Sequence, residues 1–333
     1  LLTQTVANRV YDFSHAVGGR PLRKPNALAL GQGDEMYAIL RVGYAVRQVN
    51  RLNIGAEAGD EEVLGQFGSF GEGEGEFVWP VGIAVDSRYN VYVTDEWLNR
   101  ISVFDQEGNF QYFWGTAGDG DGQLNRPSGI AVDRDDNFYI VDTLKHRVQK
   151  FTKDGGFLAK WGGPGDGPGE FDSPWGITVD GQGYVYVADH KNHRVQKLSP
   201  DGEFVAEFGS YGTGRGQLSH PTDVAVDPDG DVYICDWANN RVQLFTPDGR
   251  FLTSFIGDAQ HLSKWMQRVV DASPDVVKAR RRAYTLEPEW RLALPMGVVF
   301  DNDRGRLIIA DTHRWRVQIY NKLKDYDDPQ FNL

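Results

Sequence analysis

The chain has 333 residues, of which 40% are hydrophobic and 12% aromatic, so it can bury a sizeable core. Its formal net charge of −12 argues against nucleic acid as a partner, because the phosphate backbone would be repelled unless a local patch reversed the sign. No segment approaches the roughly 18 consecutive apolar residues of a transmembrane helix, so we expect no membrane span.

The cysteine usage and the first residues bear on the compartment. Cys235 is the single cysteine, which excludes an internal disulfide, and its position in the apolar run Val232–Cys235 predicts a buried, inert thiol. The first residues have neither the charged n-region nor the apolar h-region of a signal peptide. We therefore expect a cytoplasmic protein, and export with a signal removed before residue 1 is the alternative.

The N-terminal segment predicts one strand and then an irregular repeat. Val10-Tyr11-Asp12-Phe13 has a strand pattern and is followed by the turn residues Gly18 and Gly19. The first copy of the repeat starts at Pro25, has Leu40 where later copies have Asp, and reaches Asn50-Arg51-Leu52.

Four regular copies follow with a period of 47 residues. Their shared positions are Pro80, Pro127, Pro174 and Pro221; Asp95, Asp142, Asp189 and Asp236; and Arg100, Arg147, Arg194 and Arg241. A sixth copy, with Pro295, Asp311 and Arg316, is displaced by an insertion of about 28 residues. Three residue types held in register over four copies indicate a repeat architecture. We expect the Asp and Arg of each copy to be structural and to connect its second strand to its third.

Each copy predicts four short antiparallel strands. The copy that begins at Pro174 contains the strand-like segments 176–180, 184–189, 194–198 and 204–208, with Gly-containing turns between them. Such units, repeated radially, form the blades of a propeller. The sequence therefore predicts an all-β fold, a six-bladed β-propeller of four-stranded antiparallel blades. The last copy lacks a fourth strand, and we expect residues near 6–13 to supply it and close the ring.

An insertion between blades five and six breaks the β pattern. Leu262, Trp265, Met266, Val269 and Val270 have helical spacing, and Ser273-Pro274 predicts the start of a second helix that ends before Pro288 and carries a basic cluster. We expect this insertion to cap the channel mouth. The expected division is a closing segment 1–20; blades one to five at 21–78, 79–125, 126–172, 173–219 and 220–257; the helical insertion 258–293; blade six at 294–321; and a tail 322–333.

The repeat resembles the NHL repeat family. The resemblance rests on the segment Asp-x-x-Asn/His-His/Asn-Arg-Val-Gln-Lys-Phe, on the Asp-Gly turn after it and on the Pro-x-Gly-Ile-Ala-Val-Asp segment that opens each copy. It covers nearly the whole chain except roughly 258–293. It implies a six-bladed propeller that binds a protein, a peptide or a small ligand.

Departures from the internal repeat mark candidate ligand-binding residues, because they gather in the two sets of loops that share one face of the ring. The position two residues after the shared proline is Gly82, Gly129, Gly176 and Gly297 in four copies but Asp223 in the fifth. The candidate ligand-binding residues are Trp79, Arg126, Trp175, His190, His220, Asp223, Trp237 and His313. The three histidines come from adjacent copies and could converge to hold a metal or to transfer protons.

Two functions are therefore open. The first is a non-catalytic binding platform on the loop face. The second is a lyase or hydrolase that uses a metal or a His/Asp group at the channel mouth. Resemblance to peptidyl-hydroxyglycine amidating lyases implies zinc-binding histidines directly after the blade prolines, and none is present at Asn26, Val81, Ser128, Trp175, Thr222 or Met296. Resemblance to gluconolactonase-like propellers implies a channel cation, for which Asp223 and Asn26 are the available ligands. A divalent cation therefore stays a candidate cofactor without a defined motif.

Overall fold

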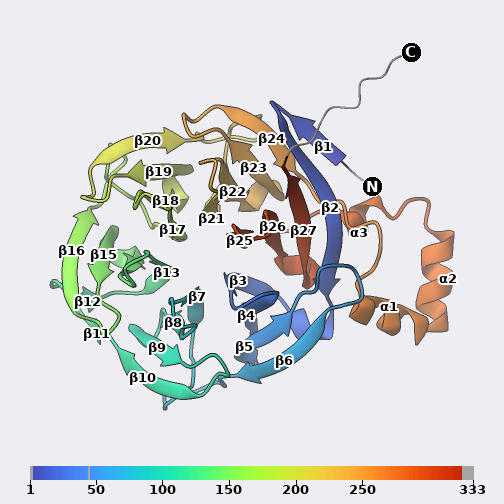
Figure 1. Ribbon diagram of the computed structural model, residues 1–333, viewed down its shortest axis with the longest axis horizontal. Coiled ribbons are helices and arrows are strands. Elements are labelled where there is room, and N and C mark those ends of the chain that lie inside the picture. The colour runs from blue at the N-terminus through green and yellow to red at the C-terminus, as the bar shows by residue number, and fades with distance from the viewer. Residues whose placement is uncertain (1–2, 44–45, 325–333) are drawn as a thin grey trace.

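Six antiparallel sheets surround a central axis, five with four strands and one with five, and each has its first strand beside the channel (Figure 1). The computed structural model describes residues 3–43 and 46–324. The expected six-bladed, all-β propeller is confirmed. No helix among these residues has the length and apolar character needed to cross a bilayer.

The strands of blades one to three are β3 (Pro25–Leu30), β4 (Glu35–Val42), β5 (Val46–Asn53), β6 (Glu62–Phe67); β7 (Pro80–Val85), β8 (Val91–Asp95), β9 (Arg100–Phe104), β10 (Phe110–Trp114); and β13 (Pro127–Val132), β14 (Phe138–Asp142), β15 (Arg147–Phe151), β16 (Phe157–Gly162). Those of blades four and five are β17 (Ile177–Val179), β18 (Val185–Asp189), β19 (Arg194–Leu198), β20 (Phe204–Phe208); and β21 (Pro221–Val226), β22 (Val232–Asp236), β23 (Arg241–Phe245), β24 (Phe251–Phe255). A short parallel pair, β11 (Thr116–Ala117) and β12 (Gln123–Leu124), lies in the loop between blades two and three.

Blade six is completed by the N-terminal segment. Its own strands are β25 (Gly297–Asp301), β26 (Arg306–Asp311) and β27 (Arg316–Leu323), and β2 (Arg9–Gly18) pairs antiparallel with β27. The expected closure by the N-terminal strand is confirmed, although the strand extends further than residues 6–13. A hairpin adds β1 (Thr3–Val6) outside β2. Strand β27 continues to Leu323, two residues into the segment expected to be a tail.

The first blade departs from the expected register. Leu40 does take the place of the shared Asp, but its partner on β5 is Gln48, so Gln48 rather than Arg51 stands at the position of the shared Arg. The assignment of Asn50-Arg51-Leu52 to that position is therefore wrong, because the connection between β4 and β5 is longer in this blade. With Leu40 in place of a carboxylate, no buried charge requires an arginine there. Arg51 instead binds Glu35, with 2.8 Å between Nη2 and Oε1.

The shared Asp and Arg connect the second strand of a blade to the third, as expected. In blade four, a carboxylate oxygen of buried Asp189 accepts from Arg194 Nε at 3.0 Å and from Gln196 Nε2 at 3.1 Å. Equivalent pairs are Asp142–Arg147 at 2.8 Å, Asp236–Arg241 at 2.7 Å and Asp311–Arg316 at 2.7 Å. In blade two, Arg100 donates instead to the carbonyl oxygens of Glu72, Gly73 and Glu76.

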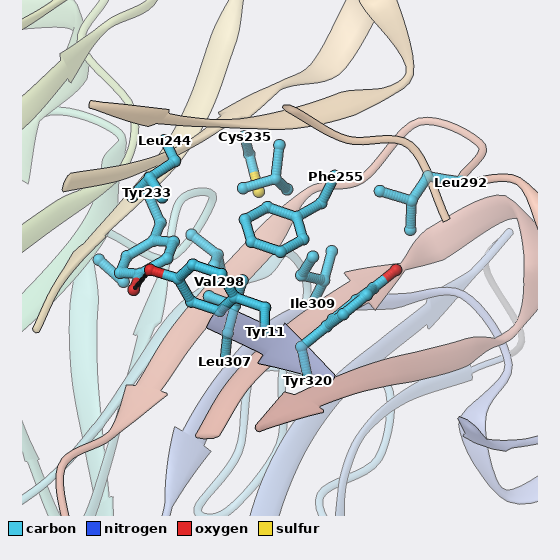
Figure 2. Close-up of a cluster of buried hydrophobic side chains, with 12 residues drawn as sticks. Tyr11, Tyr233, Cys235, Leu244, Phe255, Leu292, Val298, Leu307, Ile309 and Tyr320 are labelled. Atoms are coloured by element: carbon cyan, nitrogen blue, oxygen red, sulfur yellow. Dashed lines mark hydrogen bonds between the residues drawn. The ribbon is translucent and has the colours of Figure 1, made fainter. Parts of the chain in front are cut away.

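The core consists of apolar layers between adjacent blades. Figure 2 shows the layer between blades five and six, where Tyr11 from β2 packs edge-on against Phe255 with 5.1 Å between ring centroids. The hydroxyl groups of Tyr11 and Tyr233 are hydrogen-bonded at 2.8 Å. The closing strand therefore contributes side chains to the core as well as backbone pairing, and its removal would open this layer to water.

The insertion forms three short helices outside the ring, beside the closing strand (Figure 1). They are α1 (Lys264–Asp271), α2 (Pro274–Arg282) and α3 (Glu287–Trp290). The expected cap over the channel mouth is therefore wrong. Ser263 Oγ donates to the Gly18 carbonyl oxygen at 2.6 Å, and the Lys264 amide donates to Glu61 Oε1 at 3.0 Å. The apolar side chain of Trp265 packs on the core layer between blades six and one. The insertion leaves from an outer strand, so the nearest apolar surface is the periphery.

Candidate functional site

We call the rim the face formed by two sets of loops, those between the second and third strands of a blade and those that lead from one blade to the next. Hydrogen bonds between adjacent blades hold these loops. The residue before the shared Arg and the residue before the next Pro both have left-handed backbones, as at His193 with φ 57° and His220 with φ 54°. His193 Nδ1 accepts from the His220 amide at 3.1 Å. The same bond links His146 to Ser173, Asn99 to Arg126 and Asn240 to Leu294. His193 therefore has a structural role, shared by Asn and His side chains alike.

A second hydrogen bond holds His190 in place. Its Nδ1 lies 3.0 Å from the carbonyl oxygen of Pro221 in the next blade. Thr143 and Thr312 occupy the same position in their blades and donate to the carbonyl oxygens of Pro174 and Pro25 at 3.0 Å and 2.7 Å. A carbonyl can only accept, so Nδ1 of His190 carries a proton and Nε2 of the neutral ring is an acceptor. Burial lowers the pKa of His190 to about 4, so the ring is neutral at pH values near 7.

Blades four and five together form an aromatic–histidine cluster on the rim. The cluster consists of Trp175, His190, His193, Tyr211, His220 and Trp237. The ring centroids of His190 and His220 are 5.1 Å apart, and those of His193 and Tyr211 are 4.5 Å apart. Tyr211 is 70% exposed, so the cluster extends from a half-buried group of rings to open solvent. Four of the predicted site residues meet here.

Two other predicted residues, Trp79 and Arg126, lie in an arginine–tryptophan cluster on blades one to three. The guanidinium carbon atoms of Arg41 and Arg47 lie 4.5 Å and 4.8 Å from the ring centroid of Trp79. Arg126 Nη1 lies 2.9 Å from Glu96 Oε1, and its guanidinium carbon lies 5.6 Å from the ring centroid of Trp97, which is 58% exposed. Burial lowers the pKa of Arg41 to about 10. Arg41 remains a cation at neutral pH.

The expected convergence of three histidines is not found. His313 is exposed at the start of its turn, and the ring contacts join His190 and His220 to His193 instead. The sequence interpretation missed His193 because this position was treated as part of the repeat motif. The signal was available, since two copies have His and two have Asn there.

Over residues 3–43 and 46–324, one group of three potential metal ligands is close enough to share an ion, and it contains no histidine. It consists of Asp227, Asp229 and Asp231 in the turn between β21 and β22. Lys322 Nζ already lies among these carboxylates, at 2.5 Å, 2.8 Å and 2.9 Å from an oxygen of each. Arg9 makes two further hydrogen bonds to Asp231, both 2.7 Å long. Two cations of the chain, Lys322 and Arg9, therefore offset most of the charge of the three carboxylates. These ion pairs connect both strands of the closure to blade five.

Asp223 lies apart from the rim clusters, in the central channel. The channel has a volume of about 420 Å³ and is lined by the first strands of the six blades. Asp223 Oδ2 accepts from the Val298 amide at 2.9 Å, which connects blade five to blade six. Burial raises the pKa of Asp223 to about 7, against the lowering effect of the Val298 and Val224 amides.

The fold and the rim geometry together define the class of protein. It is a closed six-bladed β-propeller with a polar and aromatic loop face. The NHL repeat model matches residues 124–151, 171–198 and 218–245, which include the Asp, Arg and buried Gln of blades three to five. The chain therefore contains NHL repeats and folds as a six-bladed β-propeller.

Short segments of the chain are similar to curated proteins. Protein brain tumor of Drosophila melanogaster is 42% identical over 50 residues, or 15% of this chain and 5% of that protein. Protein lin-41 of Caenorhabditis elegans is 50% identical over 44 residues, or 13% of this chain and 4% of that protein. The matches therefore span a small part of these relatives.

Solved structures match over nearly the whole chain. A streptogramin B lyase has a TM-score of 0.57 at 14% identity, covering 94% of this chain and 98% of its own. A gluconolactonase from Xanthomonas campestris has a TM-score of 0.59 at 16% identity, covering 95% of this chain and 91% of its own. At these identities the likeness shows the fold.

Proposed function

We propose that this NHL-repeat propeller is a binding platform whose rim recognises a segment of a partner polypeptide. The observation that carries the proposal is the aromatic–histidine cluster, where ring side chains from two adjacent blades meet outside the apolar core and reach solvent at Tyr211. Tryptophan, tyrosine and arginine are the residue types that contribute most to binding at protein interfaces. Trp237, Tyr211 and Arg126 supply all three types on one face.

The charges of the rim favour a particular kind of segment. His190 is neutral and the pKa of His193 is lowered by burial, so the cluster on blades four and five presents uncharged rings. In the cluster on blades one to three, Arg41 and Arg126 bring positive charge to the rim, where Arg126 pairs with Glu96. A segment with apolar or aromatic side chains at one end and a carboxylate at the other would match both. Proteins and peptides are therefore the preferred ligands, and a small ligand could use the aromatic–histidine cluster alone.

The test is selection of peptides on the full chain from a random phage-displayed library, followed by measurement of the selected peptides in solution. Trp237→Ala and Tyr211→Ala should each weaken binding by roughly thirtyfold, the loss typical of an aromatic hot spot. Tyr284→Ala is the matched control, because Tyr284 is fully exposed on the peripheral insertion. Peptides that bind both rim variants as well as the unsubstituted protein would overturn the proposal.

A lyase or hydrolase is the second candidate, and His190 is the observation that favours it. The neutral imidazole of His190 can accept a proton at Nε2, and its ring centroid lies 5.1 Å from that of His220. These are features of a general base. The test is turnover of lactone and ester substrates with and without added Zn²⁺ or Ca²⁺. Activity abolished by His190→Thr, which can keep the hydrogen bond to Pro221, would favour the enzyme. Activity that survives this substitution would assign the chemistry elsewhere.

A further inference from the structure

The central channel contains one charged side chain. Its wall comes from the first strands of all six blades, and Asp223 is the single ionisable group among the described residues that line it. Glycine occupies the equivalent position at Gly82, Gly129, Gly176 and Gly297. A carboxylate in this place costs free energy unless a partner neutralises it, since burial removes the charged group from water.

The protein holds the carboxylate without neutralising it. Asp223 Oδ2 accepts from the Val298 amide at 2.9 Å, and a Cβ placed on Gly176 would lie 2.6 Å from Oδ1, so the side chain is fixed between the first strands of blades four and six. Among the described residues, backbone amides alone donate to it. This contrasts with Asp231, on the opposite face, which receives both Arg9 and Lys322.

The lining indicates the kind of cation that would complete the site. Calcium takes six or more oxygen ligands and magnesium requires near-octahedral oxygen geometry, whereas a single carboxylate with amide and carbonyl groups supplies one negative charge. A monovalent ammonium matches that charge and donates hydrogen bonds to carboxylate oxygens. The rest of the wall combines apolar side chains with polar groups, including the side chains of Asn26 and Thr222, and Trp175 and Met296 lie at the rim end of the channel. The volume of about 420 Å³ is that of a site for a small organic molecule.

We propose that the channel binds a small organic amine, with its ammonium group on Asp223 and its apolar body along the first strands of the blades. The channel and the aromatic–histidine cluster share Trp175, but the contact of the ammonium group with Asp223 does not depend on recognition of a polypeptide by the rim. Failure of the amine site would leave the rim proposal intact, and the converse also holds.

The test is calorimetric titration of the full chain at about pH 8, where a carboxyl group with a pKa near 7 is mostly ionised. The probe is benzylamine, and benzyl alcohol is its uncharged counterpart. Benzylamine should bind, and benzyl alcohol should bind roughly ten- to hundredfold more weakly, the loss expected for a charge-assisted hydrogen bond. Asp223→Asn should weaken benzylamine binding by a similar factor.

Two controls make the outcome decisive. Asp223→Gly restores the residue found in four other blades, so this variant keeps the test valid if Asp223→Asn fails to fold. Asp201→Asn removes an equal charge from an exposed turn and should leave benzylamine binding unchanged. Equal binding of the alcohol and the amine, benzylamine binding that persists in Asp223→Gly, or Ca²⁺ that binds the site and displaces benzylamine would each overturn the proposal.

Discussion

The Lys322 ammonium lies 2.9 Å from a carboxylate oxygen of Asp231, and it is closer still to Asp227 at 2.5 Å and Asp229 at 2.8 Å. Burial lowers the pKa of Lys322, but Tyr11 and these carboxylates outweigh it and raise the pKa, so the group stays charged. A cation from the last strand thus occupies the place that a metal ion could take. Because β27 is paired with β2, this interaction connects both sides of the ring closure to blade five.

Lys322→Ala should therefore destabilise the fold by about 3 kcal/mol, the cost of leaving a buried carboxylate without its partner. The measurement is the free energy of unfolding in urea at neutral pH. Lys278→Ala is the control, because its side chain is 66% exposed in the peripheral insertion and forms one long contact with Asp275. Equal stabilities for the two variants would show that Lys322 is dispensable for closure.

Asp189→Ala should destabilise the protein by about 1–3 kcal/mol, because Arg194 and Gln196 lose their buried acceptor. Thermal unfolding checks the size of the effect, with exposed Asp201→Ala as the control. Binding of a selected rim peptide should be unchanged at a temperature where the variant is folded. A variant that loses the peptide while keeping its stability would place Asp189 in the binding site.

Truncation should separate the two N-terminal strands. Deleting residues 1–7 removes β1, which has no fully buried residue, and should lower the melting temperature little. Deleting residues 1–18 also removes β2 and the core side chain Tyr11, and it leaves β27 as an open edge. The larger deletion should cause aggregation or a large drop in melting temperature. Similar melting curves for both truncations would contradict the role assigned to β2.

The free energy of unfolding should decrease as the pH is lowered through the titration range of His190. Its folded-state pKa is about 4 against an ordinary value of 6.5, so between these values the unfolded chain binds more protons than the folded one. The stabilising contribution is complete above about pH 6.5 and is lost as the pH falls towards 4, by at most about 3 kcal/mol. His190→Thr should reduce this dependence in urea unfolding at about pH 7 and about pH 4.5. The same pH dependence in both proteins would rule out His190 as its source.

The period of the repeat predicted the fold because each blade depends on local alternation and on a few shared residues such as Asp142 and Arg147. It could not predict the pairing of β4 with β5 in the first blade. Leu40 stands there in place of the shared Asp, so no carboxylate fixes which residue of β5 lies opposite, and Gln48 rather than Arg51 takes that position. The place of the insertion also could not be inferred from its helical pattern. Trp265 needed an apolar surface, and the sequence does not say that the periphery near β2 offers one closer than the channel mouth.

The candidate site was predicted in part for a similar reason. Departures from the repeat identified His190, His220 and Trp237, which do meet, because neighbouring copies place equivalent positions side by side. His193 was overlooked because it conforms to the repeat, and His313 was included although the ring contacts of the cluster join His190 and His220 to His193 instead. Side chains that serve both the repeat and the rim can be recognised only once the blade-to-blade hydrogen bonds are known.

The pairing of β2 with β27 also determines how the ring would respond to tension. Val10 lies opposite Leu323 and Gly18 opposite Arg316, so the start of β2 and the end of β27 lie at the same end of the two paired strands. A force applied through the two ends of the chain would therefore break the ladder one hydrogen bond at a time, since antiparallel strands pulled from one edge unzip rather than shear. The six-bladed ring would therefore open from its seam at low force.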